Sequence, residues 1–135
     1  MSMKVLIADP DWHFSQQVSD YLELRAHLVV TESRQEQAAE RVNHWRPDLA
    51  IVAAEMADDD LMKTLYALNP RPAVLLTGWM DRYALAWKAW QKGGDDLLIK
   101  PVFSTDDLHE AIVTAMENAA TGTRKGSRPR AAASA

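Results

Sequence analysis

Three polar side chains that could do chemistry stand at the ends of three separate apolar runs. They are Asp9, Thr77 and Lys100. A carboxylate, a hydroxyl and an ammonium group together offer a cation ligand, a hydrogen-bonding group and a positive charge for an anion. A fourth run ends at Ala53, whose methyl group can neither move a proton nor attack a substrate. The elements that carry these four positions decide whether they meet.

Five apolar runs of strand length alternate with segments of helical periodicity. The predicted strands are 4–8, 27–31, 49–53, 73–77 and 96–99. Buried strands separated by amphipathic helices predict a parallel sheet with helices on both faces. Ligands of such sheets bind beyond the carboxyl ends of the strands. We therefore expect Asp9, Ala53, Thr77 and Lys100 to point at one shallow cleft.

Several residues predict where the helices begin and end. Asp11 is suited to cap the first helix, and Ser33 with Glu36 forms a capping box for a second helix that runs to about Trp45. The fourth helix is expected over 81–92, followed by Gly93 as a C-terminal stop. The first helix carries an apolar stripe of Phe14, Val18, Tyr21 and Leu22.

Composition predicts one domain over residues 1–120 and a disordered basic tail or linker over 121–135. The chain has 135 residues, no cysteine and four of its 15 basic residues in that tail, so residues 1–120 carry 11 basic and 19 acidic side chains, a net charge of −8. Such an acidic body argues against nucleic acid as a partner. No apolar run approaches the ~20 residues of a membrane helix, so we expect no membrane partner and a cytoplasmic location.

The runs VLIAD, RPDLAIVA, VLLTG and GGDDLLIKP, in this order and spacing, resemble a response-regulator receiver domain over residues 3–119. The resemblance implies an α/β, flavodoxin-like (CheY-like) three-layer sandwich. Its sheet has five parallel strands in the order 2-1-3-4-5, and five helices cover it. It also implies a cis bond between Lys100 and Pro101, since cis is cheap only before proline.

The resemblance implies a phosphoryl-transfer site whose parts are only half present here. Thr77 matches the hydroxyl that binds the phosphoryl group, and Lys100 matches the lysine that neutralises it. Ala53 occupies the position of the phospho-acceptor aspartate, and Pro10 replaces the second member of an acidic pair that begins with Asp9. We expect no catalytic residue, no enzymatic activity, no cofactor and at best residual Mg²⁺ binding at Asp9.

A further departure lies three residues before the lysine, where Leu97 replaces the family's aromatic switch residue. The leading hypothesis is therefore a pseudo-receiver that acts in signal transduction as a phosphorylation-independent protein-interaction module. In its vestigial receiver site Lys100 is expected to pair with Asp9.

Two rival hypotheses stay open. The first is a receiver that is phosphorylated on a non-standard acceptor such as Glu55 or Asp9, although Glu55 is interpreted as a solvated loop residue. The second is a small-molecule-binding α/β domain that reuses the vacated cleft. The sequence has no glycine-rich phosphate loop for a nucleotide.

Aromatic residues concentrate around the fourth predicted helix. Trp79, Tyr83, Trp87 and Trp90 step by helical spacings and are predicted to share one face, with Leu85 and Ala89 turned toward the sheet. The stripe is either core or an exposed patch for a partner. The resemblance places the family's interaction surface on the fourth helix, fifth strand and fifth helix, so we expect a protein partner or a homodimer there.

The remaining polar residues predict no second site. The four histidines have no metal-ligand spacing, and Asp58, Asp59 and Asp60 are interpreted as a solvated loop and helix N-terminus.

Overall fold

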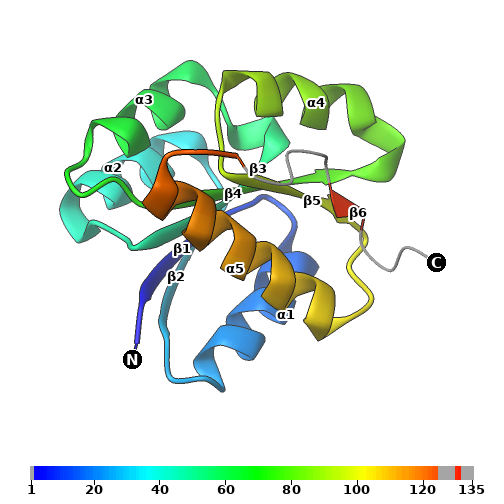
Figure 1. Cartoon of the computed structure of the whole chain (residues 1–135). Coiled ribbons are helices and arrows are strands. Elements are labelled where there is room, and N and C mark those ends of the chain that lie inside the picture. The colour runs from blue at the N-terminus through cyan, green and yellow to red at the C-terminus, as the bar shows by residue number, and fades with distance from the viewer. Residues whose placement is uncertain (1, 125–129, 132–135) are drawn as a thin grey trace.

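Parallel strands form the central sheet of the computed structural model, which describes residues 2–124 and 130–131 (Figure 1). The first five strands are β1 (Lys4–Ala8), β2 (Leu28–Glu32), β3 (Leu49–Ala53), β4 (Ala73–Trp79) and β5 (Asp96–Lys100). Their order is β2-β1-β3-β4-β5, and each neighbouring pair is parallel, as predicted.

Five α-helices cover the two faces of the sheet. They are α1 (Trp12–Glu23), α2 (Gln35–Trp45), α3 (Asp59–Ala67), α4 (Tyr83–Lys92) and α5 (Thr105–Thr121), with two 3₁₀ turns, η1 (Ala54–Met56) and η2 (Met80–Arg82). Helices α1 and α5 lie on one face, and α2, α3 and α4 lie on the other (Figure 1). The three layers are those of the flavodoxin-like sandwich.

Strand pleating divides the core into two clusters. In β1, Val5 and Ile7 pack with α1 and α5, whereas Leu6 and Ala8 pack with the helices of the opposite face. All four side chains are buried because the sheet is covered on both sides. The same alternation fixes which face each strand-end residue points to.

The observed helix ends agree only in part with those predicted from the sequence. The Asp11 carboxylate accepts a hydrogen bond from the Phe14 amide at 3.2 Å, so the predicted cap of α1 is confirmed. The predicted capping box of α2 is wrong, because the helix begins one residue later. Arg34 is its N-cap, without a side-chain hydrogen bond, and Ser33 therefore lies outside capping position. The predicted end of this helix at Trp45 is confirmed.

Helix α4 begins at Tyr83, later than the predicted 81, because η2 occupies the residues before it. The helix lies unusually close to β4. A Cβ atom built on Gly78 would come within 2.5 Å of the Ala86 Cβ, so only glycine permits this approach. The Lys100–Pro101 bond at the end of β5 is cis, as expected, and so is Asn69–Pro70.

The chain after α5 contacts the domain where it is described. The Arg124 guanidinium donates to the carbonyl oxygens of Gly94 at 2.9 Å and Trp90 at 2.8 Å, and it lies 3.6 Å from the Trp90 ring centroid. A two-residue strand, β6 (Arg130–Ala131), pairs in parallel with β5 and was not predicted. Most of the predicted disordered tail lies outside the described residues. No helix in 2–124 is long and apolar enough to span a bilayer.

Gly78→Ala is expected to lower the free energy of unfolding by about 1–3 kcal/mol, the usual cost of overpacking a core. Urea denaturation measures this change. The matched control repeats the substitution in an Ala86→Gly background, where the opposing methyl group is gone and the penalty of Gly78→Ala should shrink. Equal penalties in the two backgrounds would contradict the close approach of α4 to β4.

Candidate functional site

The four predicted residues lie at or near the carboxyl edge of the sheet, although β4 continues two residues beyond Thr77 to Trp79. Ala53 of β3 pairs in register with Thr77 of β4, and Asp9 directly follows the end of β1. Lys100 is the last residue of β5. Pleating places all four side chains on the face that α1 and α5 cover. The site is therefore built by the sheet itself.

A buried ion pair joins two of these residues. The Lys100 Nζ lies 2.9 Å from the Asp9 Oδ2, and both side chains are only 1% exposed. This is the predicted salt bridge. The ammonium also lies 4.5 Å from the Phe14 ring centroid and 4.8 Å from that of Trp79. One carboxylate and two aromatic rings therefore surround the Lys100 charge, an arrangement that compensates a cation removed from water.

The Asp9 carboxylate has both of its oxygens engaged. Oδ1 accepts a hydrogen bond from the Asp11 amide at 2.8 Å, while Oδ2 accepts from Lys100. Burial raises the pKa of the Asp9 carboxyl above its ordinary value, and the hydrogen bond and charge of Lys100 act in the opposite direction. A metal ion at Asp9 would bind beside the Lys100 ammonium, whose positive charge repels it.

Thr77 and Ala53 form the other half of the site. Both residues are 0% exposed. The Thr77 hydroxyl has no hydrogen-bond partner among the described residues, and the side chain opposite it in the register is the Ala53 methyl group. A buried hydroxyl without a partner is rare in proteins. Here its neighbour on β3 offers no acceptor.

Glu55 is not the solvated loop residue that the sequence suggested. It lies in η1, its side chain is 24% exposed, and its carboxylate is 3.7 Å from the guanidinium of Arg82. Its negative charge contributes to the raised pKa of Asp9. The residue is partly buried because the chain turns into a 3₁₀ helix directly after β3.

Leu97 points away from the strand-end site. It is fully buried in the cluster on the α4 side of the sheet, together with Ala86 and Trp90. Lys100, three residues later in β5, faces α1 and α5 instead. An aliphatic side chain therefore fills the place that the resemblance gives to an aromatic switch.

The predicted aromatic face of α4 is wrong for Trp79, and the alternative that the stripe is core holds for Trp90. Trp79 is the last residue of β4, and its ring lies over Lys100. Trp90 is only 5% exposed and belongs to the core. Tyr83 and Trp87, at 41% and 42% exposed, remain on the surface as an i, i+4 pair.

Of the two residues predicted to face the sheet, Ala89 is buried as expected, whereas Leu85 is 37% exposed. The buried residues of α4 are Ala86, Ala89 and Trp90. The sequence reasoning also missed Phe14 and Trp79 as partners of the Lys100 charge. Trp79 stands two residues after Thr77, so strand periodicity would have placed both on one face.

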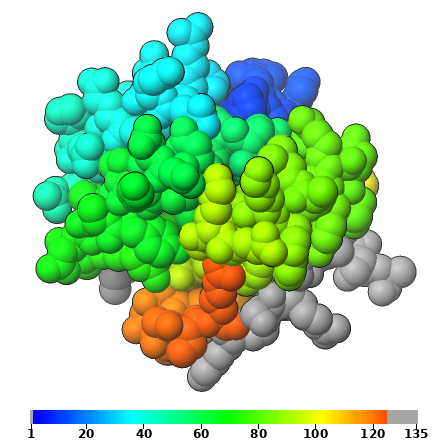
Figure 2. All heavy atoms as spheres, turned by 90° about the horizontal axis from the view of Figure 1, so that it is seen from above, coloured from blue at the N-terminus to red at the C-terminus, as the bar shows by residue number. Residues whose placement is uncertain are grey.

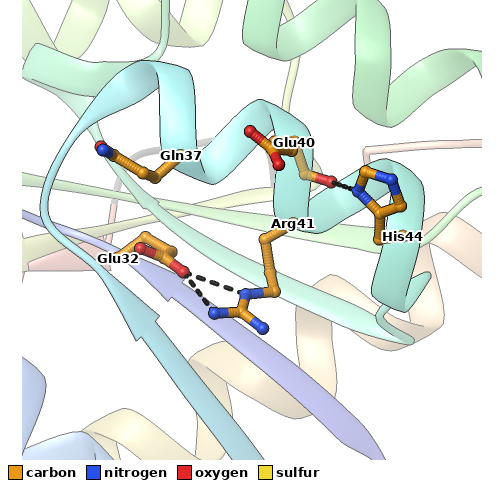
Figure 3. Close-up of a pocket in the computed structure, with 5 residues that line it drawn as sticks. All are labelled: Glu32, Gln37, Glu40, Arg41 and His44. Atoms are coloured by element: carbon orange, nitrogen blue, oxygen red, sulfur yellow. Dashed lines mark hydrogen bonds and ion pairs between the residues drawn. The ribbon is translucent and has the colours of Figure 1, made fainter.

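A separate hollow of about 410 Å³ lies between β2 and α2 (Figure 3). Arg41 lies 2.9 Å from Glu32 in an ion pair, and the His44 ring bonds to the main-chain carbonyl oxygen of Glu40. Within residues 2–124, no three histidine, aspartate or glutamate side chains are arranged to hold a metal ion.

Asp9→Asn is expected to lower the free energy of unfolding by about 3–5 kcal/mol, because it leaves the Lys100 charge buried without a counter-ion. Adding Lys100→Met should restore most of this loss. Glu32→Gln is the matched control, since the Glu32–Arg41 pair has the same 2.9 Å separation but an Arg41 side chain that is 45% exposed. Its loss should stay below about 1 kcal/mol. Urea denaturation compares the variants, and equal losses for Asp9→Asn and Glu32→Gln would contradict a special role for burial.

No protein-family model matches the chain, and no curated protein sequence matches it. Solved structures do. The structure of NtrX from Brucella abortus in complex with ADP is similar with a TM-score of 0.77 and 20% identity, over 90% of this chain but 28% of that one. This chain thus spans little more than a quarter of NtrX.

Two single-domain structures are covered over almost their whole length. The receiver domain of a modulated diguanylate cyclase from Desulfovibrio desulfuricans gives a TM-score of 0.72 at 20% identity, covering 90% of this chain and 99% of that one. The receiver domain of the Francisella response regulator 1452 gives 0.67 at 23% identity, covering 86% and 98%. The chain therefore has the fold of response-regulator receiver domains.

Proposed function

We propose that this chain is a pseudo-receiver, a non-enzymatic domain of signal transduction that binds protein partners without phosphorylation control. The observation that carries the proposal is Ala53, a fully buried methyl group at the strand end where the receiver reaction needs a carboxylate nucleophile. No side-chain movement can supply a nucleophile at that position.

The state of Lys100 supports the same proposal. In phosphoryl transfer a lysine neutralises charge on the transferred group. Here the Lys100 ammonium is 1% exposed and already bonded to Asp9 between the rings of Phe14 and Trp79. Its charge is compensated without a phosphoryl group, so the pair serves to hold the strand ends together.

Weak or absent Mg²⁺ binding is part of the proposal. Mg²⁺ is held in octahedral geometry by one or two carboxylates and several waters. Among the four strand-end residues only Asp9 carries a carboxylate, and both of its oxygens have partners. Pro10 and Ala53 supply no further ligand through their side chains.

The two rival functions have less support. Glu55 as an acceptor would first have to leave its ion pair with Arg82, and Asp9 would have to leave Lys100. A small molecule at the strand ends would meet a Lys100 charge that Asp9, Phe14 and Trp79 already surround.

Incubation with acetyl phosphate and Mg²⁺ is expected to leave the intact mass of the protein unchanged. The positive control is the double variant Pro10→Asp/Ala53→Asp, which restores both missing carboxylates and should gain a phosphoryl group in a Mg²⁺-dependent reaction. A stoichiometric phosphoryl adduct on the unmodified chain would contradict the proposal, and peptide mapping would then locate the acceptor.

The exposed pair of Tyr83 and Trp87 is the proposed contact for a protein partner on α4. Aromatic side chains of this kind concentrate binding energy at interfaces. They lie beside each other on one flank of the helix, whereas the buried Trp90 is excluded. A second copy of the chain is the simplest occupant to test.

Trp87→Ala is expected to abolish self-association while leaving the fold intact, because the side chain is 42% exposed. Trp12→Ala is the matched control, since Trp12 is 69% exposed on α1. Sedimentation equilibrium measures the mass of each variant. A dimer that survives Trp87→Ala would contradict the α4 contact, and a monomeric unmodified chain would exclude the homodimer.

A further inference from the structure

We propose that a groove between α3 and α4 binds an acidic, amphipathic segment of a protein partner. Helix α3 packs against α2, while α4 packs against β4 and η1, and the two helices leave a space between them. Two adjoining hollows of about 160 and 350 Å³ occupy this space, and Lys92 lines both. Figure 2 looks onto this face, with α3 in green beside α4 in yellow-green.

The groove has an apolar floor and apolar edges. Ala57, Met62 and Ala89 form the floor and are between 3% and 6% exposed. Tyr66 on α3 and Leu85 on α4 form the edges and are 41% and 37% exposed. An apolar floor between exposed apolar edges suits the apolar side of an amphipathic segment, as in helix-in-groove recognition.

Two of the three acidic side chains that line the groove are ion-paired. The Asp59 carboxylate lies 3.4 Å from the Lys92 ammonium, a pair that links α3 to α4, and Glu55 is paired with Arg82. The third, Asp58, accepts the Leu61 amide at 2.8 Å as the N-cap of α3 and keeps its negative charge.

Two of the lysines, in contrast, have no counter-ion. Lys63 on α3 and Lys88 on α4 line the two hollows, and neither makes an ion pair or hydrogen bond within residues 2–124. They stand on opposite sides of the apolar floor. Unpaired cations on both flanking helices favour a ligand that carries carboxylates beside its apolar side chains.

The rest of the molecule strengthens this choice of partner. Residues 1–120 carry a net charge of −8, so an acidic segment is disfavoured by the molecule as a whole and needs unpaired cations where it binds. Two lysines on so acidic a body are too few for a nucleic-acid phosphate backbone. A short acidic peptide segment fits both the charge and the shape.

The inference rests on the proposed interaction function but uses a different flank of α4. Leu85 and Lys88 lie on one side of the buried stripe formed by Ala86, Ala89 and Trp90. The proposed aromatic contact lies on the other side. A substitution can therefore test one surface without changing the other.

Selection of a random peptide library on the immobilised full chain tests the groove without assuming a partner. The expected peptides are enriched in aspartate and glutamate, with apolar residues three to four positions apart. Fluorescence anisotropy of the selected peptides then measures their Kd. We expect Lys88→Glu to weaken binding about tenfold and Lys63→Glu/Lys88→Glu more, with a steep dependence on salt.

Arg46→Glu is the matched control, because it makes the same charge change at the exposed C-cap of α2, outside the groove. It should change Kd by less than about twofold. Selected peptides without an acidic bias, or with equal affinity for Lys63→Glu/Lys88→Glu, would overturn the groove. Peptides that lose binding with Trp87→Ala, and not with the lysine variants, would overturn the groove but leave the proposed interaction function standing. A phosphoryl adduct on the unmodified chain would instead overturn the proposed function itself.

Discussion

The structure depends on how the buried charge of Lys100 is compensated. A lysine that is 1% exposed costs several kcal/mol of desolvation unless it is closely paired. Asp9 supplies the counter-charge from the end of β1, Phe14 supplies a ring from α1, and Trp79 supplies a second ring from β4. One side chain of β5 thus fixes the relative positions of three other elements at the edge where the fold would otherwise carry its chemistry.

The same compensation supports the proposal that the site is not phosphorylated. Asp9 gives Lys100 its counter-charge, and each oxygen of the Asp9 carboxylate already accepts one hydrogen bond. The Thr77 hydroxyl, which has no partner among the described residues, lies opposite the Ala53 methyl group in the register of β3 and β4.

Sequence patterns predicted the strands and most of the helices, but they failed at the boundary where strand β4 gives way to helix α4. The expectation that the carboxyl ends of parallel strands meet at one edge placed Asp9 and Lys100 together correctly. The aromatic face failed because helical spacing was extended back to Trp79, although α4 begins only at Tyr83. Burial of Trp90 was equally hidden, since spacing cannot tell which flank of a helix meets the sheet. The roles assigned to Thr77 and Ala53 came from the family resemblance, because neither residue type indicates phosphoryl chemistry by itself.

Helix α4 carries both of the surfaces that we propose for partner binding. Gly78 and Ala86 let it lie close to β4, and its buried stripe is therefore narrow and made of Ala86, Ala89 and Trp90. Both flanks of the helix stay at the surface, one aromatic and one basic. Leu97, beneath this helix, has no ring that could turn between the core and the surface. Under the pseudo-receiver function that we propose, packing rather than phosphorylation presents these two flanks to partners.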